Sequence, residues 1–206
     1  TSMSGTSSIK KVFSQVLLLS GCGIALLAWP AFVHGTLKDG LSAWTPTILG
    51  ESFGLTASFA LLVTAVLPII NFFGAYLAKA VLGLVKENVF VATALLLAAS
   101  ALSLVILSLW GMHSLFAATF LIAFAAALTM GVNTLLVSIY PLRFEGRGTV
   151  SSVSGLLNAL GYLGAAASTA ASGASALIWG WKPTFLIWAG ITATAAVVCL
   201  LGRTRK

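Results

Sequence analysis

The chain has 206 residues, of which 59% are hydrophobic and only 7% charged, and its mean hydropathy is +1.07. A soluble domain carries about 25% charged residues and needs a polar exterior. This composition excludes a water-soluble globular protein and predicts an all-α integral membrane protein. The net charge of +7 comes from 11 Lys and Arg against four acids.

Six stretches are long and apolar enough to cross the roughly 30 Å hydrocarbon core as helices. They cover residues 16–49, 57–82, 89–110, 115–141, 149–172 and 183–202. The breaks between them are short, which predicts that consecutive helices are antiparallel neighbours. The predicted organisation is an N-terminal segment 1–15, a six-helix domain 16–202 and a basic tail 203–206. In the N-terminal segment, Thr1 and Ser2 ahead of Met3 look like a tag remnant.

The first stretch is unusually long and allows two interpretations. In the first, a helix runs from about Val16 to Val33, and Lys38 lies outside the membrane. In the second, residues 20–23 (SGCG) separate an interfacial piece from a span that runs to Leu49, with its centre near Thr36. The composition alone does not decide between the two.

Ionisable side chains inside a span are costly and mark a pathway by default, and the first stretch holds His34, Lys38 and Asp39. His34 and Lys38 are four residues apart and share a helix face, so Lys38 offers a positive charge to an anionic substrate. Lys38 and Asp39 are adjacent and point about 100° apart around a helix of 3.6 residues per turn. We therefore expect them not to pair, and Asp39 either carries a coupling proton or has a structural partner elsewhere.

Polar residues also fall within the later stretches, namely Asn71, Asn133, Asn158 and Tyr162. Asn158 and Tyr162 are four residues apart and share a face. Such residues most often form interhelical hydrogen bonds, and contact with a ligand is the alternative. The fifth stretch contains the run AAASTAASG at 165–173, and small side chains of this kind let neighbouring helices approach closely.

Lysine and arginine are distributed unequally between the two sides that six antiparallel spans define. Nine of them fall on the side that holds both termini, and only Lys182 falls opposite, with Lys38 to be placed by the depth of the first span. The nine are Lys10, Lys11, Lys79, Lys86, Arg143, Arg147, Arg203, Arg205 and Lys206. Cytoplasmic loops carry this excess, so both termini are expected in the cytoplasm, and the charges need no nucleic-acid partner.

The sequence lacks the patterns of the enzyme classes that fit its size. A rhomboid-type intramembrane protease also has a six-helix core, but it needs Gly-x-Ser-Gly followed by a helical histidine. Residues 152–155 here read SVSG, and both His34 and His113 precede them. No phosphate loop, metal-ligand cluster or dinucleotide fingerprint is present in the sequence, so we expect no enzyme activity and no cofactor.

Three segments resemble the C-terminal half of organophosphate:phosphate antiporters of the major facilitator superfamily. Residues 34–49, HGTLKDGLSAWTPTIL, are similar to the seventh helix of that group, in which a basic residue and Gly precede Trp-x-Pro-Thr. Residues 131–164 resemble its tenth and eleventh helices, and 180–188 resemble the start of its twelfth. Lys38 stands where the family has Arg, so the bidentate guanidinium fork is missing. Lys79 stands in the stretch 74–79 where many members have an acid.

The resemblance implies one six-helix half of the superfamily fold, built of two inverted three-helix repeats, with substrate bound between two halves. It implies a mid-membrane Lys38 that faces a phosphate-bearing substrate, with His34, Asn133, Asn158 and Tyr162 in or near the cavity. The implied function is secondary transport of a small anion by alternating access in a bacterial cytoplasmic membrane. The partner is a second copy or a separately encoded N-terminal half. A transporter-like sensor or assembly subunit without transport is the alternative.

Overall fold

The computed structural model describes residues 23–204, which are helical apart from short turns and contain no strand. Five helical segments in this range are long and apolar enough to cross a membrane, by length and composition. The prediction of an all-α, multi-pass membrane protein is therefore confirmed. The predicted N-terminal segment 1–15, and Arg205 and Lys206 of the predicted basic tail, lie outside the described residues.

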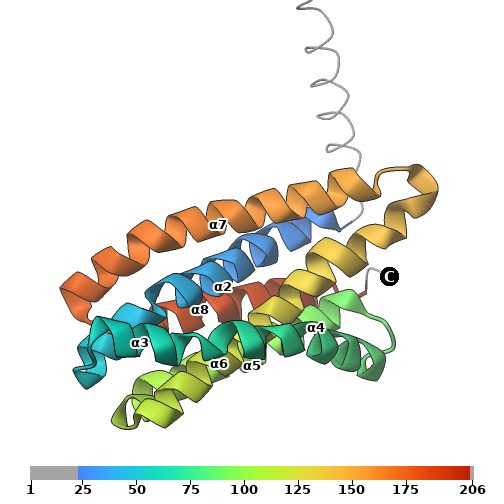
Figure 1. The fold of residues 1–206 in the computed structure, drawn as a ribbon. Helices are drawn as coiled ribbons and strands as arrows, with labels where there is room; N and C mark the ends of the chain where they lie inside the picture. The colour runs from blue at the N-terminus through green and yellow to red at the C-terminus, as the bar shows by residue number, and fades with distance from the viewer. Residues whose placement is uncertain (1–22, 205–206) are drawn as a thin grey trace, which may run out of the picture.

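Six passes through the bundle form an antiparallel array (Figure 1). The passes are α2 (Ile24–Phe53), α3 (Ala57–Thr64) with α4 (Val66–Leu84), α5 (Val89–Leu109), α6 (Leu115–Asn133), α7 (Val150–Trp179) and α8 (Trp181–Leu201). Beyond α6 the chain stays helical as a π-helix, η3 (Thr134–Ile139), and a 3-10 helix, η4 (Tyr140–Arg147); a short 3-10 turn, η2 (Gly111–His113), precedes α6. The fifth pass extends beyond the predicted residue 172, since α7 continues through Gly173 to Trp179 and ends at Gly180, whose φ is 81°.

From residue 24 on, the first predicted stretch forms one long helix, α2. It begins after Gly23, whose φ of 88° is the left-handed conformation that glycine adopts without strain, and it continues to Phe53. Lys38 and Asp39 lie at its midpoint, as the second interpretation of the sequence requires. Helix α2 is the pass that is not among the five candidate spans, since His34, Lys38 and Asp39 lower its hydropathy.

The second pass is broken at Ala65, between α3 and α4. Pro68 explains the break, because its ring clashes with the carbonyl of Thr64 and it has no N–H to donate to that carbonyl. Two other prolines, Pro30 and Pro46, lie inside α2 without interrupting it.

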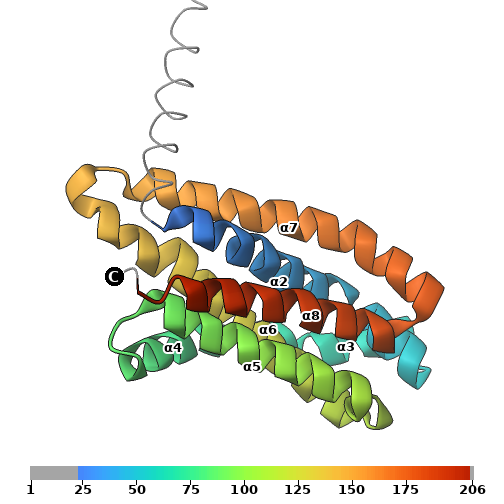
Figure 2. The same ribbon diagram turned by 180° about the vertical axis from the view of Figure 1, so that it is seen from behind.

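The helices pack in a definite set of pairs. Helix α2 lies along α7, α4 along α6, and α5 along α8; further contacts join α5 with α6 and α2 with both α6 and α8. Figures 1 and 2 show α7 on the outside of α2, and α4 on the far side of the bundle from α7. The N-terminal end of α2 and the C-terminal end of α8 lie at the same end of the bundle in both views.

Glycines bring two of these pairs into backbone contact. A Cβ atom on Gly35 of α2 would collide with the carbonyl of Gly161 of α7, and one on Gly164 would collide with the carbonyl of Phe32. In the α4–α6 pair, a Cβ on Gly74 would collide with the carbonyl of Ala127. Both crossings are therefore closer than any larger residue would allow, as in the small-residue contacts common between membrane helices.

Candidate functional site

An open cavity lies against the middle of α2, between that helix, α4 and α6. Its volume is about 630 Å³, and Lys38, Asp39 and Ser42 of α2 line one wall. The lining residues on the other helices are Pro68, Asn71, Phe72, Ala75 and Tyr76 of α4 and Met130 of α6. Lys38 and Asp39, both predicted from the sequence, therefore lie at one cavity. They are at the middle of α2, which runs from Ile24 to Phe53.

The prediction that Lys38 and Asp39 do not pair is wrong. The Lys38 Nζ lies 3.2 Å from the Asp39 Oδ1, and the two side chains are 25% and 38% exposed. The four-carbon stem of lysine lets the ammonium fold sideways across the 100° step between adjacent residues, and a helix offers it no better counter-ion. Within residues 23–204, this is the ion pair that the structure records.

The wall formed by α4 was not assigned to the site from the sequence. Asn71 has a buried amide oxygen without a hydrogen-bond partner among the described residues, and the Tyr76 side chain is 64% exposed. The five α4 residues of the wall are spaced three, one, three and one residues apart, which is the signature of a single helix face. That spacing from Pro68 to Tyr76 was the signal in the sequence that would have identified them.

His34 and Asn133 contact each other instead of the cavity. His34 is 2% exposed, and its Nε2 lies 3.1 Å from the Asn133 Oδ1, linking α2 to α6. The ring also lies against Gly161 of α7, where a Cβ would stand 3.0 Å from its Cε1. His34 therefore occupies the contact between three helices, one turn from Lys38 on the same face.

Asn158 and Tyr162 lie on α7, which packs on another side of α2. Asn158 is half-buried, and Tyr162 is 64% exposed on the outer face of α7. Neither lines the cavity beside Lys38. Their predicted place in a substrate cavity stays a prediction that depends on a second half.

The cavity offers one cation, one carboxylate, a hydroxyl at Ser42 and amide and phenol groups at Asn71 and Tyr76, above an apolar floor of Phe72 and Met130. Among residues 23–204 no three His, Cys, Asp or Glu side chains gather in a way that could hold a metal ion. Because Lys38 is paired with Asp39, a small anion at this site would have to take the place of that carboxylate. Comparison with known families, curated proteins and solved structures finds no match to this chain.

Proposed function

We propose that this chain is one half of a secondary transporter that moves a small anion, phosphate or an organophosphate, across a bacterial cytoplasmic membrane. The observation that carries the proposal is the open cavity lined by Lys38 at the midpoint of α2. A charge at this depth costs roughly 2.5–3.5 kcal/mol on insertion, and it is retained by default for a function. Substrate sites of secondary transporters lie at the same depth.

The chemistry of the cavity favours an anion with additional hydroxyl groups. An incoming phosphate competes with the Asp39 carboxylate for the Lys38 ammonium, which lies 3.2 Å from it. Asn71, Ser42 and Tyr76 provide neutral hydrogen-bonding groups around that position. An organophosphate presents both kinds of partner, because its phosphoryl oxygens accept hydrogen bonds and its carbon skeleton carries hydroxyls.

The pattern of helix packing supports two inverted three-helix repeats. In two such repeats the first pass corresponds to the fourth, the second to the fifth and the third to the sixth. Under this correspondence, the α2–α7 pair becomes the α6–α4 pair. The same correspondence turns α5–α6 into α8–α2 and leaves α5–α8 and α2–α6 unchanged, and all of these pairs are in contact. Glycine makes the closest approach in both α2–α7 and α4–α6. Repeats of this kind build the halves of the major facilitator superfamily.

One half provides only one wall of a transport pathway, so the proposal requires a partner. Alternating access follows when two halves rock around a shared midplane site. The second half is another copy of this chain or a separately encoded N-terminal half. A pair of copies would place two Lys38 side chains at one cavity, and both termini of each chain in the cytoplasm.

The test begins with the native mass of the purified protein in detergent or nanodiscs. A dimer directs flux assays to this chain alone, and a monomer directs them to co-expression with an N-terminal half. Uptake of radiolabelled inorganic phosphate and glycerol phosphate into liposomes is then measured. Counterflow that depends on Lys38 supports transport, whereas binding without flux supports the sensor or assembly role.

The Lys38→Met variant removes the charge and keeps most of the side-chain volume. We expect it to weaken phosphate binding by about tenfold to a hundredfold, the range for a lost hydrogen bond to a charged group. Lys182→Met, at the start of α8 and outside the cavity, is the matched control and should bind as the unchanged protein does. Equal binding by the Lys38→Met variant would remove Lys38 from the site and with it the proposal.

A further inference from the structure

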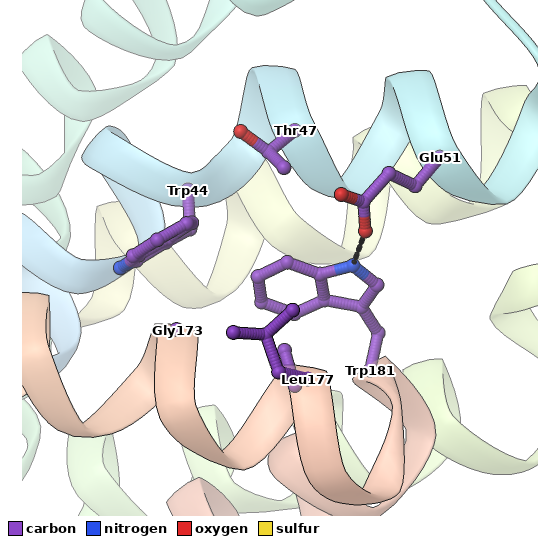
Figure 3. A pocket seen from close by; sticks show the side chains of 7 residues that line it. Trp44, Thr47, Glu51, Gly173, Leu177 and Trp181 are labelled. Carbon is purple, nitrogen blue, oxygen red and sulfur yellow. Dashed lines mark hydrogen bonds between the residues drawn. The ribbon is translucent and has the colours of Figure 1, made fainter.

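A second, smaller cavity lies at the opposite end of the bundle from the C-terminus, where α2 and α7 end and α8 begins. Its volume is about 160 Å³, and its lining residues are Trp44, Thr47, Glu51, Gly173, Ala176, Leu177 and Trp181. Figure 3 shows Thr47 and Glu51 on α2 facing Gly173 and Leu177 on α7, with the Trp181 indole reaching toward Glu51. None of these residues lines the Lys38 cavity.

Two indole rings form the walls of this cavity, and both are held in place. The Trp44 and Trp181 ring centroids are 5.7 Å apart, with the planes inclined by 51°. Trp181 donates its Nε1–H to the Glu51 Oε2 at 2.7 Å and stacks on Phe185. Trp44 fits only because residue 173 is glycine, where a Cβ would lie 2.8 Å from the Trp44 Cη2.

These tryptophans differ from those that anchor a protein at the membrane surface. Trp110 and Trp179 end their helices at the same end of the bundle and are 67% and 60% exposed, as members of an interfacial belt are. Trp181 is only 9% exposed, and its N–H is satisfied by a carboxylate within the protein. An anchoring role therefore accounts for Trp110 and Trp179, whereas Trp44 and Trp181 pack in the interior of the bundle beside this cavity.

Glu51 supplies a negative charge beside the rings. Its Oε2 accepts from Trp181, and within residues 23–204 no lysine, arginine or histidine nitrogen lies within ion-pair distance of it. The Thr47 hydroxyl lies one turn away on the same helix. A carboxylate with indole faces attracts a cation whose surface is partly apolar, because the ring quadrupole and the carboxylate act in the same direction.

We propose that this cavity binds a small organic ammonium group, with Glu51 as its counter-ion and Trp44 and Trp181 as the aromatic walls. The volume suits such a group, since an apolar cavity of about 150 Å³ accommodates a molecule the size of benzene. Aromatic cages recognise quaternary ammonium in this way. The inference is independent of the anion site at Lys38, which lies at the middle of α2 rather than near its end.

The test uses the purified full-length protein in detergent, with choline as the probe and isothermal titration calorimetry as the readout. The neutral isostere 3,3-dimethyl-1-butanol has the same shape without the charge. We expect choline to bind and the isostere to bind at least about tenfold more weakly. Glu51→Gln should lower choline affinity by about tenfold or more, while its amide oxygen still accepts the Trp181 N–H.

Two further variants test whether a loss of choline binding is specific to the cavity or results from misfolding. Trp44→Leu removes one aromatic wall on the other side of the cavity and should also weaken choline binding, whereas Trp110→Phe, at an exposed indole outside the cavity, should leave it unchanged. Each variant is first checked for an unchanged elution volume. Equal binding of choline and its isostere, or undiminished binding by Glu51→Gln or Trp44→Leu, would overturn the proposal.

The same ammonium group can come from a free metabolite or from a lipid headgroup, and nanodiscs distinguish these sources. If a phosphatidylcholine headgroup fills the cavity, choline should bind more weakly in phosphatidylcholine discs than in phosphatidylglycerol discs. Equal affinity in both discs assigns the site to a free ammonium compound. Either result requires that Glu51→Gln weakens the binding of choline.

Discussion

The outer faces of α4 and α7 differ in chemistry although both helices are at the periphery of the bundle. In the most apolar 18-residue stretch of residues 57–84, only 17% is buried inside the protein. The corresponding share is 22% in α7 and 61% in α5. The exposed large side chains of α4 are Val66, Ile69, Phe72, Phe73, Tyr76 and Leu84. Between Ser151 and Ala174, the exposed residues of α7 are Ser, Gly, Ala or Thr, apart from Tyr162 and Leu163.

This difference between the outer faces of α4 and α7 indicates where a second half would pack. Lipid tails are as apolar as leucine, so a bulky apolar face gains little by leaving lipid for protein. A face of small residues lets another helix approach its backbone closely, and membrane helix contacts are enriched in such residues. On the proposed function, the small-residue face of α7 therefore allows the second half a closer approach than the bulky outer face of α4 does, while Phe72 and Tyr76 of α4 line the Lys38 cavity.

The inner faces of α4 and α7 are alike in that a glycine on each allows a close contact with a neighbouring helix. The largest expected effect comes from replacing these glycines with leucine. Gly74→Leu forces a side chain against the Ala127 carbonyl of α6, with which a Cβ already collides, and Gly161→Leu forces one against the His34 ring of α2, 3.0 Å from a Cβ. Overpacking of this kind costs typically 1–3 kcal/mol and occasionally more, and backbone contact puts Gly74→Leu at about 3 kcal/mol. Thermal unfolding of the purified variants in detergent measures the loss.

The control for this experiment is Gly83→Leu, also on α4. A Cβ at Gly83 meets nothing within 4 Å, so its unfolding temperature should stay close to that of the unchanged protein. A Gly74→Leu variant as stable as Gly83→Leu would contradict the close α4–α6 crossing.

A smaller effect, on association with the second half, tests the difference between the outer faces of α4 and α7. Gly155 on α7 and Gly83 on α4 both face open space, with nothing within 4 Å of an added Cβ. We expect Gly155→Leu to weaken association with the second half by about tenfold, because it places a bulky side chain on the face that needs a close approach. Gly83→Leu should not change association. Native mass measured over a dilution series reads out both, and equal dissociation constants would assign the interface elsewhere.

The smallest effect concerns a hydrogen bond that strengthens one of the two glycine crossings. The Thr36 Oγ1 donates to the Gly164 carbonyl at 3.2 Å, joining α2 to α7. Thr36→Val keeps the shape and removes the donor, so it should cost about 0.6 kcal/mol, the average for interhelical hydrogen bonds in a membrane. Ser42→Ala, whose hydroxyl donates within α2 to Lys38, is the control for losing a hydroxyl. A shift in unfolding temperature no larger than that of the control would contradict the contribution of Thr36.

The sequence was sufficient for the class of fold and for the cation of the candidate site. Long apolar stretches separated by charged or glycine-containing breaks predicted six antiparallel passes, and a lone lysine in an apolar context marked Lys38. Helix ends were harder to predict. Helix α7 continues to Trp179 through residues that occur equally well in helices and in loops, so the sequence did not mark its end. The break at Ala65 follows from Pro68, whereas Pro30 and Pro46 leave α2 unbroken.

Side-chain partners were the least predictable part of the site. The contact of His34 with Asn133 joins residues 99 positions apart, and no local pattern announces a pairing over that distance. The Lys38–Asp39 pair was missed because helical geometry fixes the direction of Cβ but not the path of a long flexible stem. The α4 wall was detectable from its spacing, but only once Lys38 was known to lie beside α4.

The ion pair at the centre of α2 also has a consequence for how the chain enters the membrane during synthesis. Each charge adds roughly 2.5–3.5 kcal/mol to the cost of moving a lone helix from the translocon into lipid, and pairing Lys38 with Asp39 offsets part of it. The helix that covers α2 most extensively, α7, is synthesised last but one. Among the described helices α2 is synthesised first, so on the proposed function it reaches its final packing only after α7 has emerged.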